Sequence, residues 1–162
     1  MKLRDLFAWL ALAVAAVVFW LTWPGNNSTF SGRASVIDGD TIHVGSHRVR
    51  LFGIDAPELA QLCGTVACGE RARAFLLELT ADRPVSCRRV DTDKFKRTVA
   101  TCITWHGHDL SEEMVRAGWA IELRYYSSGL YSTAEREARA AGAGVWSLKF
   151  QRPSEFRAEH KR

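Results

Sequence analysis

The sequence predicts one small, mainly β domain with helices, built as a partly open barrel behind an apolar N-terminal segment. The chain has 162 residues, which is room for one ordinary domain. Its 47% apolar and 25% charged residues are close to globular averages and exclude disordered and collagen-like chains. Five short strand-like segments, interrupted by a helix after the third, suit a small barrel better than a parallel sheet. A sandwich would need more strands.

The first three predicted strands lie ahead of the first helix. Segments 34–37 and 41–44 flank Asp38-Gly39, a dipeptide typical of a short hairpin. The third strand covers residues 48–54 and ends before Pro57, which cannot donate to a strand ladder. The domain is therefore expected to begin with a hairpin and one further strand.

Strands four and five are predicted over residues 85–91 and 97–105, with a two-residue loop at residues 94–95. In that register, residues whose numbers sum to 189 face each other, so Cys87 lies opposite Cys102. Directly opposed residues of an antiparallel pair lie close enough for a disulfide. The hairpin therefore indicates a disulfide across its two strands.

The four cysteines agree with an exported domain. Their spacings match none of the common zinc patterns, and four cysteines allow three pairings, among which sequence alone does not choose. Cys63 with Cys68 would close a small loop before the first helix, alongside the Cys87–Cys102 pair. Buried free thiols are the alternative and would be preferred in a cytosolic chain. Behind an export signal, two local disulfides are the favoured interpretation.

Three helices are predicted from periodicity and capping signals. Residues 70–80 carry apolar side chains at helical spacing. Residues 109–112 form a capping box for a helix that ends at Gly118. Residues 132–135 form a second capping box, ahead of a helix that stops at the glycines of segment 142–144.

An apolar run of 18 residues, from Leu6 to Trp23, reaches the length of a membrane span. Lys2 and Arg4 precede it, which places residue 1 in the cytoplasm and the domain outside the membrane. A cleaved signal peptide is the alternative, but the run ends in bulky residues where cleavage needs small ones. We therefore expect a single-pass anchor with the domain facing the periplasm or exterior, or a secreted protein if the segment is cleaved.

These features divide the chain into four parts. Residues 1–23 are the anchor or signal sequence, and residues 24–31 are a polar linker with strong helix and strand breakers. The folded domain is expected over residues 32–150. Residues 151–162 are expected to be a C-terminal tail that frays from Arg157 onward.

Charged residues at predicted turns and strand ends indicate a phosphodiesterase site. Asp40, Asp55 and Glu58 supply carboxylates, and Arg50 and Arg97 supply guanidiniums. Each residue alone is typical of a solvated turn or strand face, and the net charge of +4 permits nucleic-acid binding without indicating it. Together, the carboxylates and a backbone carbonyl suit calcium, and the two guanidiniums match a phosphate bidentately.

Five motifs follow one another along the chain. They are Val36-Ile-Asp-Gly-Asp-Thr41, Arg50-Leu-Phe-Gly-Ile-Asp-Ala-Pro-Glu58, Asp93-Lys-Phe-Lys-Arg-Thr98, Met114-Val-Arg-Ala-Gly-Trp-Ala120 and Gly144-Val-Trp146. In order, spacing and identity they resemble the staphylococcal nuclease (thermonuclease) family, over residues 33–147. The resemblance implies an OB-fold barrel of five strands with three helices. It also implies calcium-dependent hydrolysis of DNA and RNA that leaves a 3′-phosphate and a 5′-hydroxyl.

The resemblance assigns a role to each site residue. Calcium would be held by the carboxylates of Asp40 and Asp55 and by the backbone carbonyl of Ala56, where the family often has Thr. Glu58 would be the general base that deprotonates the attacking water. The two arginines would bind the phosphate and stabilise the charge that develops on it. We expect a monomer that acts on DNA, RNA or both.

Two residues in the turn of the second hairpin depart from the family pattern. Lys96 stands where the family usually has Gly, and because a positive φ would cost lysine about 1–2 kcal/mol, we expect a turn of another type. Phe95 replaces the usual Tyr but keeps a stacking surface. Lys94, Phe95, Tyr125 and Tyr126 are the expected substrate contacts, and packing in the core or at its rim is the alternative for the aromatic residues.

Counting along the third strand predicts a break within it. Arg50 and Asp55 are five residues apart, so a regular strand would place them on opposite faces, although the site needs both together. Gly53 is the natural place for a bulge or bend. The alternative is that Gly53 makes room for a bulky neighbour such as Phe75 or Trp119.

Two other functions account for parts of the sequence. A non-catalytic barrel that binds nucleic acid or protein would keep this fold, but inactive members of the family lose carboxylates or arginines, and all five side chains are present here. An envelope-anchored structural domain explains the apolar segment and the cysteines but leaves the site unexplained. A nuclease is therefore the preferred interpretation, and calcium-dependent degradation of nucleic acid would separate it from both.

Overall fold

The computed structural model describes residues 12–15, 17–18, 28–81 and 83–160. The described residues before Ser28 are helical. Within the described part of the chain, no helix combines the length and the apolar character needed to cross a membrane. Most of the predicted span from Leu6 to Trp23 lies outside the described residues, so the anchor stays a prediction.

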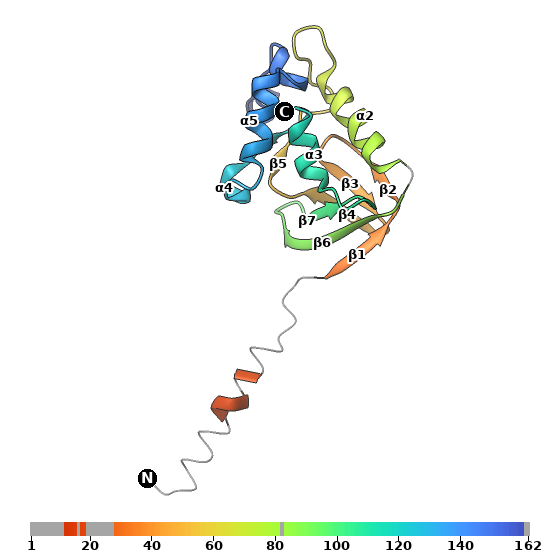
Figure 1. The fold of residues 1–162 in the computed structure, drawn as a ribbon, viewed down its shortest axis with the longest axis vertical. Helices are drawn as coiled ribbons and strands as arrows, with labels where there is room; N and C mark the ends of the chain where they lie inside the picture. Colours follow the sequence, from red (N-terminus) through yellow and green to blue (C-terminus); the bar gives the residue numbers. More distant parts are fainter. Residues whose placement is uncertain (1–11, 16, 19–27, 82, 161–162) are drawn as a thin grey trace, which may run out of the picture.

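A six-stranded sheet that curls almost into a barrel forms the centre of the domain (Figure 1). Its order is β1-β6-β7-β4-β3-β2, with bounds Thr29–Gly32, Val85–Thr92, Thr98–Ile103, His47–Leu51, Thr41–Val44 and Ala34–Val36. The two edge strands, β1 and β2, are separated by Arg33 alone. Because consecutive strands occupy opposite edges, the sheet has to curve back on itself, which is consistent with an OB-fold.

Two elements extend the five strands that the sequence predicts. Strand β1 begins inside the predicted linker 24–31, ends at Gly32 and pairs antiparallel with β6. Strands β5 (Ile54–Asp55) and β8 (Ile121–Glu122) pair in a separate two-stranded sheet. These strands are only two to four residues long, too short to show a pattern of alternating polar and apolar residues. They are defined by backbone hydrogen bonds to strands that are distant in the sequence.

The break predicted in the third strand is confirmed. Strand β4 ends at Leu51, residues 52 and 53 form a turn, and β5 starts at Ile54. Gly53 has a φ of +73°, a region that favours glycine. A Cβ atom at Gly53 would also approach Ser127 and Tyr131 to 2.9 and 3.0 Å. Gly53 therefore also makes room for close neighbours, but these are Ser127 and Tyr131 and not Phe75 or Trp119.

The second hairpin confirms the cross-strand pair but corrects the loop. Cys87 lies opposite Cys102 and is disulfide-bonded to it, and Cys63 is bonded to Cys68. The register shifts by one residue at a bulge between Arg89 and Asp91. The two-residue loop was therefore wrong: the turn spans residues 93–97, and the amide of residue 93 donates to the carbonyl of residue 97 at 3.0 Å.

The turn of this hairpin does contain a left-handed residue, contrary to the expectation of another turn type. Lys96 has a φ of +62°. A non-glycine residue in this region carries a steric cost, which the surrounding hydrogen bonds to Asp93 outweigh.

We expect Lys96→Gly to raise the free energy of unfolding by about 1 kcal/mol. Glycine adopts this φ without the Cβ clash, and this gain exceeds the larger loss of chain entropy when glycine folds. Urea unfolding followed by circular dichroism measures the change. Lys94→Gly, in the same turn at a position without positive φ, is the matched control and should destabilise slightly. Equal effects of the two variants would show that Lys96 is not strained.

Helices gather on one side of the sheet (Figure 1). Their bounds are Cys68–Thr80 for α2, Leu110–Arg116 for α3, Arg124–Ser127 for α4, Ser132–Ala141 for α5 and Pro153–Glu159 for α6, with a 3₁₀ turn at Gly144–Ser147. Asp109 caps α3 as predicted, accepting from the amides of Ser111 and Glu112. Ser132 is not the cap of α5, because the cap position is Tyr131 and no side chain bonds there.

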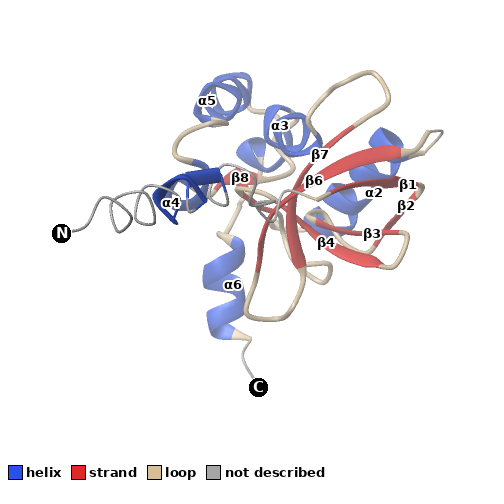
Figure 2. Ribbon diagram, turned by 90° about the horizontal axis from the view of Figure 1, so that it is seen from below, coloured by secondary structure: helices blue, strands red, loops and turns tan. Residues whose placement is uncertain are grey.

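Helix α6 lies in the segment predicted to be a tail (Figure 2). Pro153 occupies its first turn, which suits a residue without an amide hydrogen, and is buried. Before α6, Leu148 and Phe150 pack on a small cluster formed by Val145 and the Cys63–Cys68 disulfide. Residues 148–153, which include the first residues of the segment expected to be a tail, thus pack against the folded domain.

Candidate active site

Two buried aspartates, one at the end of a loop and one at the end of a strand, lie near each other beside the barrel. Asp40 ends the β2–β3 loop, where its amide donates to Asp38 Oδ1 at 3.0 Å. Its own carboxylate accepts from the amide of Ala56 at 3.0 Å and from the hydroxyl of Thr41 at 3.0 Å. Asp55 ends β5, and its side chain is only 1% exposed. The turn at residue 53 and this loop therefore bring two carboxylates and the backbone of Ala56 together.

Arg50 bridges both carboxylates. Its Nη1 is ion-paired with Asp40 Oδ1, and its Nη2 donates to Asp55 Oδ1 at 2.9 Å and to the carbonyl of Ile54 at 2.9 Å. Burial lowers the pKa of the Arg50 guanidinium, and the charge of Asp55 opposes that shift. Because one guanidinium spans the pair, the two carboxylates lie within reach of one cation.

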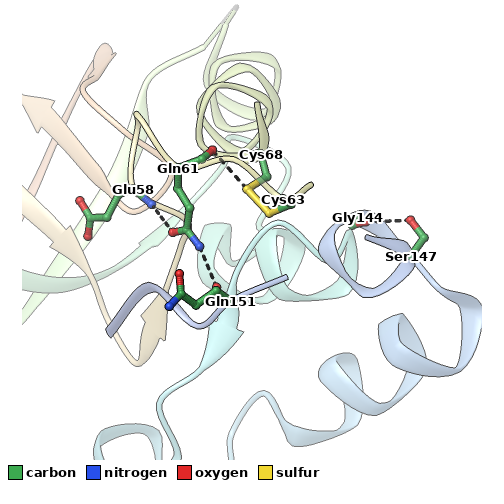
Figure 3. Close-up of a disulfide and its surroundings, with 7 residues drawn as sticks. All are labelled: Glu58, Gln61, Cys63, Cys68, Gly144, Ser147 and Gln151. Carbon is green, nitrogen blue, oxygen red and sulfur yellow. Dashed lines mark hydrogen bonds between the residues drawn. A yellow bond between two sulfur atoms is a disulfide. The ribbon is translucent and has the colours of Figure 1, made fainter. Parts of the chain in front are cut away.

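Glu58 lies on the loop that follows β5, and its side chain is 38% exposed. Its amide donates to Oε1 of Gln61 at 3.1 Å, and Nε2 of Gln61 donates to the carbonyl of Gln151 at 2.7 Å. Figure 3 shows Gln61 between these two segments. Gln61 is fully buried, so it joins the Glu58 loop to the chain that leads into α6.

Arg157, on α6, reaches the same carboxylates. Its Nη1 donates to Glu58 Oε1 at 2.7 Å and to Asp55 Oδ1 at 3.1 Å, and its Nη2 donates to Asp55 Oδ2 at 3.0 Å. Partial burial opposes the charged form, but these hydrogen bonds outweigh it and raise the pKa of Arg157. Sequence reasoning missed this residue. The one available signal was the helix start at Pro153-Ser-Glu155.

Arg97 approaches the site from the β6–β7 turn. Its Nε donates to Asp93 Oδ2 at 2.7 Å, and its Nη1 donates to Thr41 Oγ1 at 3.4 Å. Partial burial opposes ionisation of Asp93, but its hydrogen bonds with Arg97 lower the pKa of that carboxyl overall. Because Thr41 bonds Asp40, Arg97 is connected to the carboxylates through one hydroxyl.

The expected substrate contacts fall into two groups. Phe95 is 67% exposed in the β6–β7 turn, with Lys94 Nζ 5.1 Å and Arg97 Cζ 5.6 Å from its ring centroid. Tyr125 and Tyr126, on α4, are 90% and 64% exposed, so neither is a core residue. No hydrogen bond or ion pair of the described residues joins these four side chains to the carboxylates.

An open pocket of about 600 Å³ adjoins α4. Its lining combines the two tyrosines with four arginines, at positions 124, 136, 139 and 152, and two glutamates, at positions 122 and 135, of which Glu135 is ion-paired with Arg139. Strand β8, which contributes Glu122 to the pocket, pairs with β5, and Ile121 lies opposite Asp55. A basic, aromatic pocket thus lies on the element next to the carboxylate pair.

The donors fit a hard divalent cation in kind. Asp40 and Asp55 offer carboxylate oxygens, the ligand type that calcium prefers, and the amide of Ala56 donates to Asp40 beside them. Among the described residues, no group of three or more His, Cys, Asp or Glu side chains has the arrangement of a metal centre. A cation at this position would therefore use two carboxylates, with a backbone carbonyl and water completing its shell.

Comparison with known proteins adds to this geometry. A family model described as staphylococcal nuclease homologue matches residues 48–148. The succinoglycan biosynthesis protein ExoI of Rhizobium meliloti is 36% identical over 140 residues, 83% of this chain and 73% of that protein. The micrococcal nuclease of Shigella flexneri is 32% identical over 161 residues, 90% and 89% of the two chains. An uncharacterized endonuclease of Haemophilus influenzae is 32% identical over 133 residues, which are 78% of this chain and 71% of that protein.

Proposed function

Because the chain belongs to the staphylococcal nuclease family, we propose that this thermonuclease-like nuclease hydrolyses phosphodiester bonds of DNA, RNA or both, with calcium as its cofactor. The observation that carries the proposal is the bridge of Arg50 between Asp40 and Asp55, together with the bridge of Arg157 between Asp55 and Glu58. Carboxylates and guanidiniums converge there as phosphodiester hydrolysis requires.

Each residue has a task in the proposed reaction. Glu58 accepts a proton from the attacking water, whose oxygen bonds to phosphorus as the bond to the 5′ oxygen breaks. The leaving oxygen takes a proton from solvent, so the products are a 3′-phosphate and a 5′-hydroxyl. Arg50 and Arg97 donate to the equatorial oxygens, where negative charge grows in the transition state. Asp40, Asp55 and the carbonyl of Ala56 would hold calcium, which would supply positive charge to neutralise and orient the phosphate.

The pocket beside α4 supports a nucleic-acid substrate. Stacking on an exposed aromatic ring contributes roughly 1–3 kcal/mol per base and accepts any base, because every base has a π face. Tyr125 and Tyr126 lie edge to face, with ring centroids 5.1 Å apart, and the arginines of the pocket outnumber its glutamates by four to two, which favours phosphates. Lys94 and Phe95 offer a second stacking surface at the β6–β7 turn.

A nuclease assay tests the proposal. Purified protein should degrade single- and double-stranded DNA and RNA in calcium and should stop in excess EGTA. Analysis of the fragment ends should find 3′-phosphates. A protein that binds these nucleic acids but leaves them intact in calcium would favour the non-catalytic barrel, and degradation indifferent to EGTA would refute the calcium site.

We also propose that the segment Leu6–Trp23 anchors the domain on the outer side of a membrane, either as a single-pass span or, if cleaved, as an export signal. Its support is the apolar run preceded by Lys2 and Arg4. Fractionation of cells expressing the full chain, followed by protease treatment of intact spheroplasts, tests it. A domain that stays in the cytosolic fraction would contradict both forms.

A further inference from the structure

We infer that Arg157 is a third arginine of the active site, a positioning residue that holds the carboxylate of Glu58 in place for proton transfer. This inference rests on the proposed nuclease function. It concerns a residue nine positions beyond the end of the family-model match at residue 148. Arg157 acts through Glu58 and Asp55 and touches no reacting atom.

Glu58 needs such a partner because little else restrains its side chain. It follows Pro57 on a loop without regular secondary structure, and glutamate has three rotatable side-chain bonds. Within the described part of the chain, the hydrogen bond from Arg157 to Oε1, at 2.7 Å, is the contact that its carboxylate makes. Oε2 has no hydrogen bond there, so it remains open to accept one from water.

Arg157 is itself well anchored for a residue near the end of the chain. Gln61 bonds both the Glu58 amide and the Gln151 carbonyl, which fixes the start of α6 relative to the Glu58 loop (Figure 3). The Cys63–Cys68 disulfide closes the chain just after Gln61, and Cys68 Sγ lies 3.3 Å from the Gln61 carbonyl oxygen. The loop and the helix are thus held as one unit.

The contacts of Arg157 favour support of the site over obstruction. It bonds Asp55 and Glu58, whereas Asp40 and Ala56, the other expected cation ligands, bond Arg50, Thr41 and each other. Its side chain is 43% exposed, and it donates to both carboxylate oxygens of Asp55. Asp55 Oδ1 accepts from both Arg50 and Arg157, and Oδ2 accepts from Arg157, so the two guanidiniums together fix the orientation of this carboxylate.

Steady-state kinetics of the full chain in saturating calcium test the inference. Arg157→Ala should lower kcat roughly 10- to 100-fold, the usual effect of losing a hydrogen bond to a charged partner, with KM changed less than about threefold. Arg157→Lys should recover part of kcat, because a lysine ammonium reaches one carboxylate but cannot bridge two. Lys149→Ala, which removes an exposed charge ahead of α6, is the control and should retain wild-type kcat.

A double-mutant cycle separates positioning from a purely structural role. In a Glu58→Gln background, Arg157→Ala should cost less than about threefold, because its effect passes through Glu58. Calorimetric calcium titration should give a Kd for Arg157→Ala no higher than that of the wild type, since removing a nearby cation does not weaken cation binding. Equal losses in both backgrounds would show a structural role and overturn the inference.

The remaining outcomes are also decisive. Higher activity of Arg157→Ala, with a lower calcium Kd, would show that Arg157 obstructs the cation position and would overturn the inference. Wild-type kcat in Arg157→Ala would overturn it as well while leaving the nuclease proposal intact. An inactive wild-type protein with normal calcium binding would instead defeat the proposed function itself.

Discussion

Glu58→Gln is expected to lower kcat by about 10²–10⁴ while leaving calcium binding unchanged, the usual contribution of a general base. Glutamine keeps the shape of the side chain and the backbone bond from residue 58 to Gln61, so the loop should stay folded. What it loses is the ability to take a proton from water. Single-turnover cleavage of a labelled oligonucleotide, together with calcium titration, measures both quantities.

A matched control keeps this test specific. Glu70→Gln makes the same chemical change at an exposed position in the first turn of α2 and should retain wild-type turnover. Near-normal turnover in Glu58→Gln would mean that another group deprotonates the water and that the family role has been assigned to the wrong carboxylate. Weakened calcium binding would make Glu58 a ligand rather than a base.

Arg50→Ala is expected to destabilise the calcium-free protein by about 3–5 kcal/mol, the cost of removing one partner from a buried ion pair. The substitution leaves Asp40 and Asp55 facing each other in a buried site, with Arg157 contacting Asp55 alone. Because calcium supplies the missing positive charge, its addition should stabilise the variant more than the wild type. Urea unfolding in EGTA and in calcium gives both free energies.

An exposed arginine provides the comparison for Arg50. Arg116 pairs with Glu112 and Glu137 on the surface, so Arg116→Ala should change stability far less. A loss at Arg50 no larger than the loss at Arg116 would show that the two aspartates do not depend on Arg50 for their charge balance. A calcium response equal to that of the wild type would place the cation elsewhere.

Parity and register arithmetic predicted the central geometry of this site. Because side chains alternate along a strand, Arg50 and Asp55 could share one site only if the strand broke between them. The structure has that break at Gly53, and Arg50 donates to Asp55 at 2.9 Å. The same counting placed Cys87 opposite Cys102. The first prediction succeeded because side-chain alternation is a local property of the strand. The second succeeded although the loop is one residue longer than expected, because the bulge between Arg89 and Asp91 offsets that extra residue.

Local geometry was also where some predictions failed. The loop of the second hairpin was misplaced because a bulge near Arg89 shifts the register, and nothing in the residue pattern marks that bulge. Lys96 adopts a left-handed backbone despite its Cβ, because the amides of residues 95 and 97 donate hydrogen bonds to the Asp93 carboxylate and favour that turn. At this position, hydrogen bonding outweighs the intrinsic preference of lysine for a negative φ.

Residue identity and spacing thus identified the three carboxylates and two of the arginines, Arg50 and Arg97, together with the turns and strand ends that carry them. They did not identify the third arginine. Arg157 is 102 residues from Asp55, and the contact exists because Gln61 and the packing of Leu148 and Phe150 turn the C-terminal segment back onto the barrel. Periodicity and capping rules describe neighbours within a few residues, whereas such a contact depends on how a closed sheet, a disulfide loop and a short helix fill the same space.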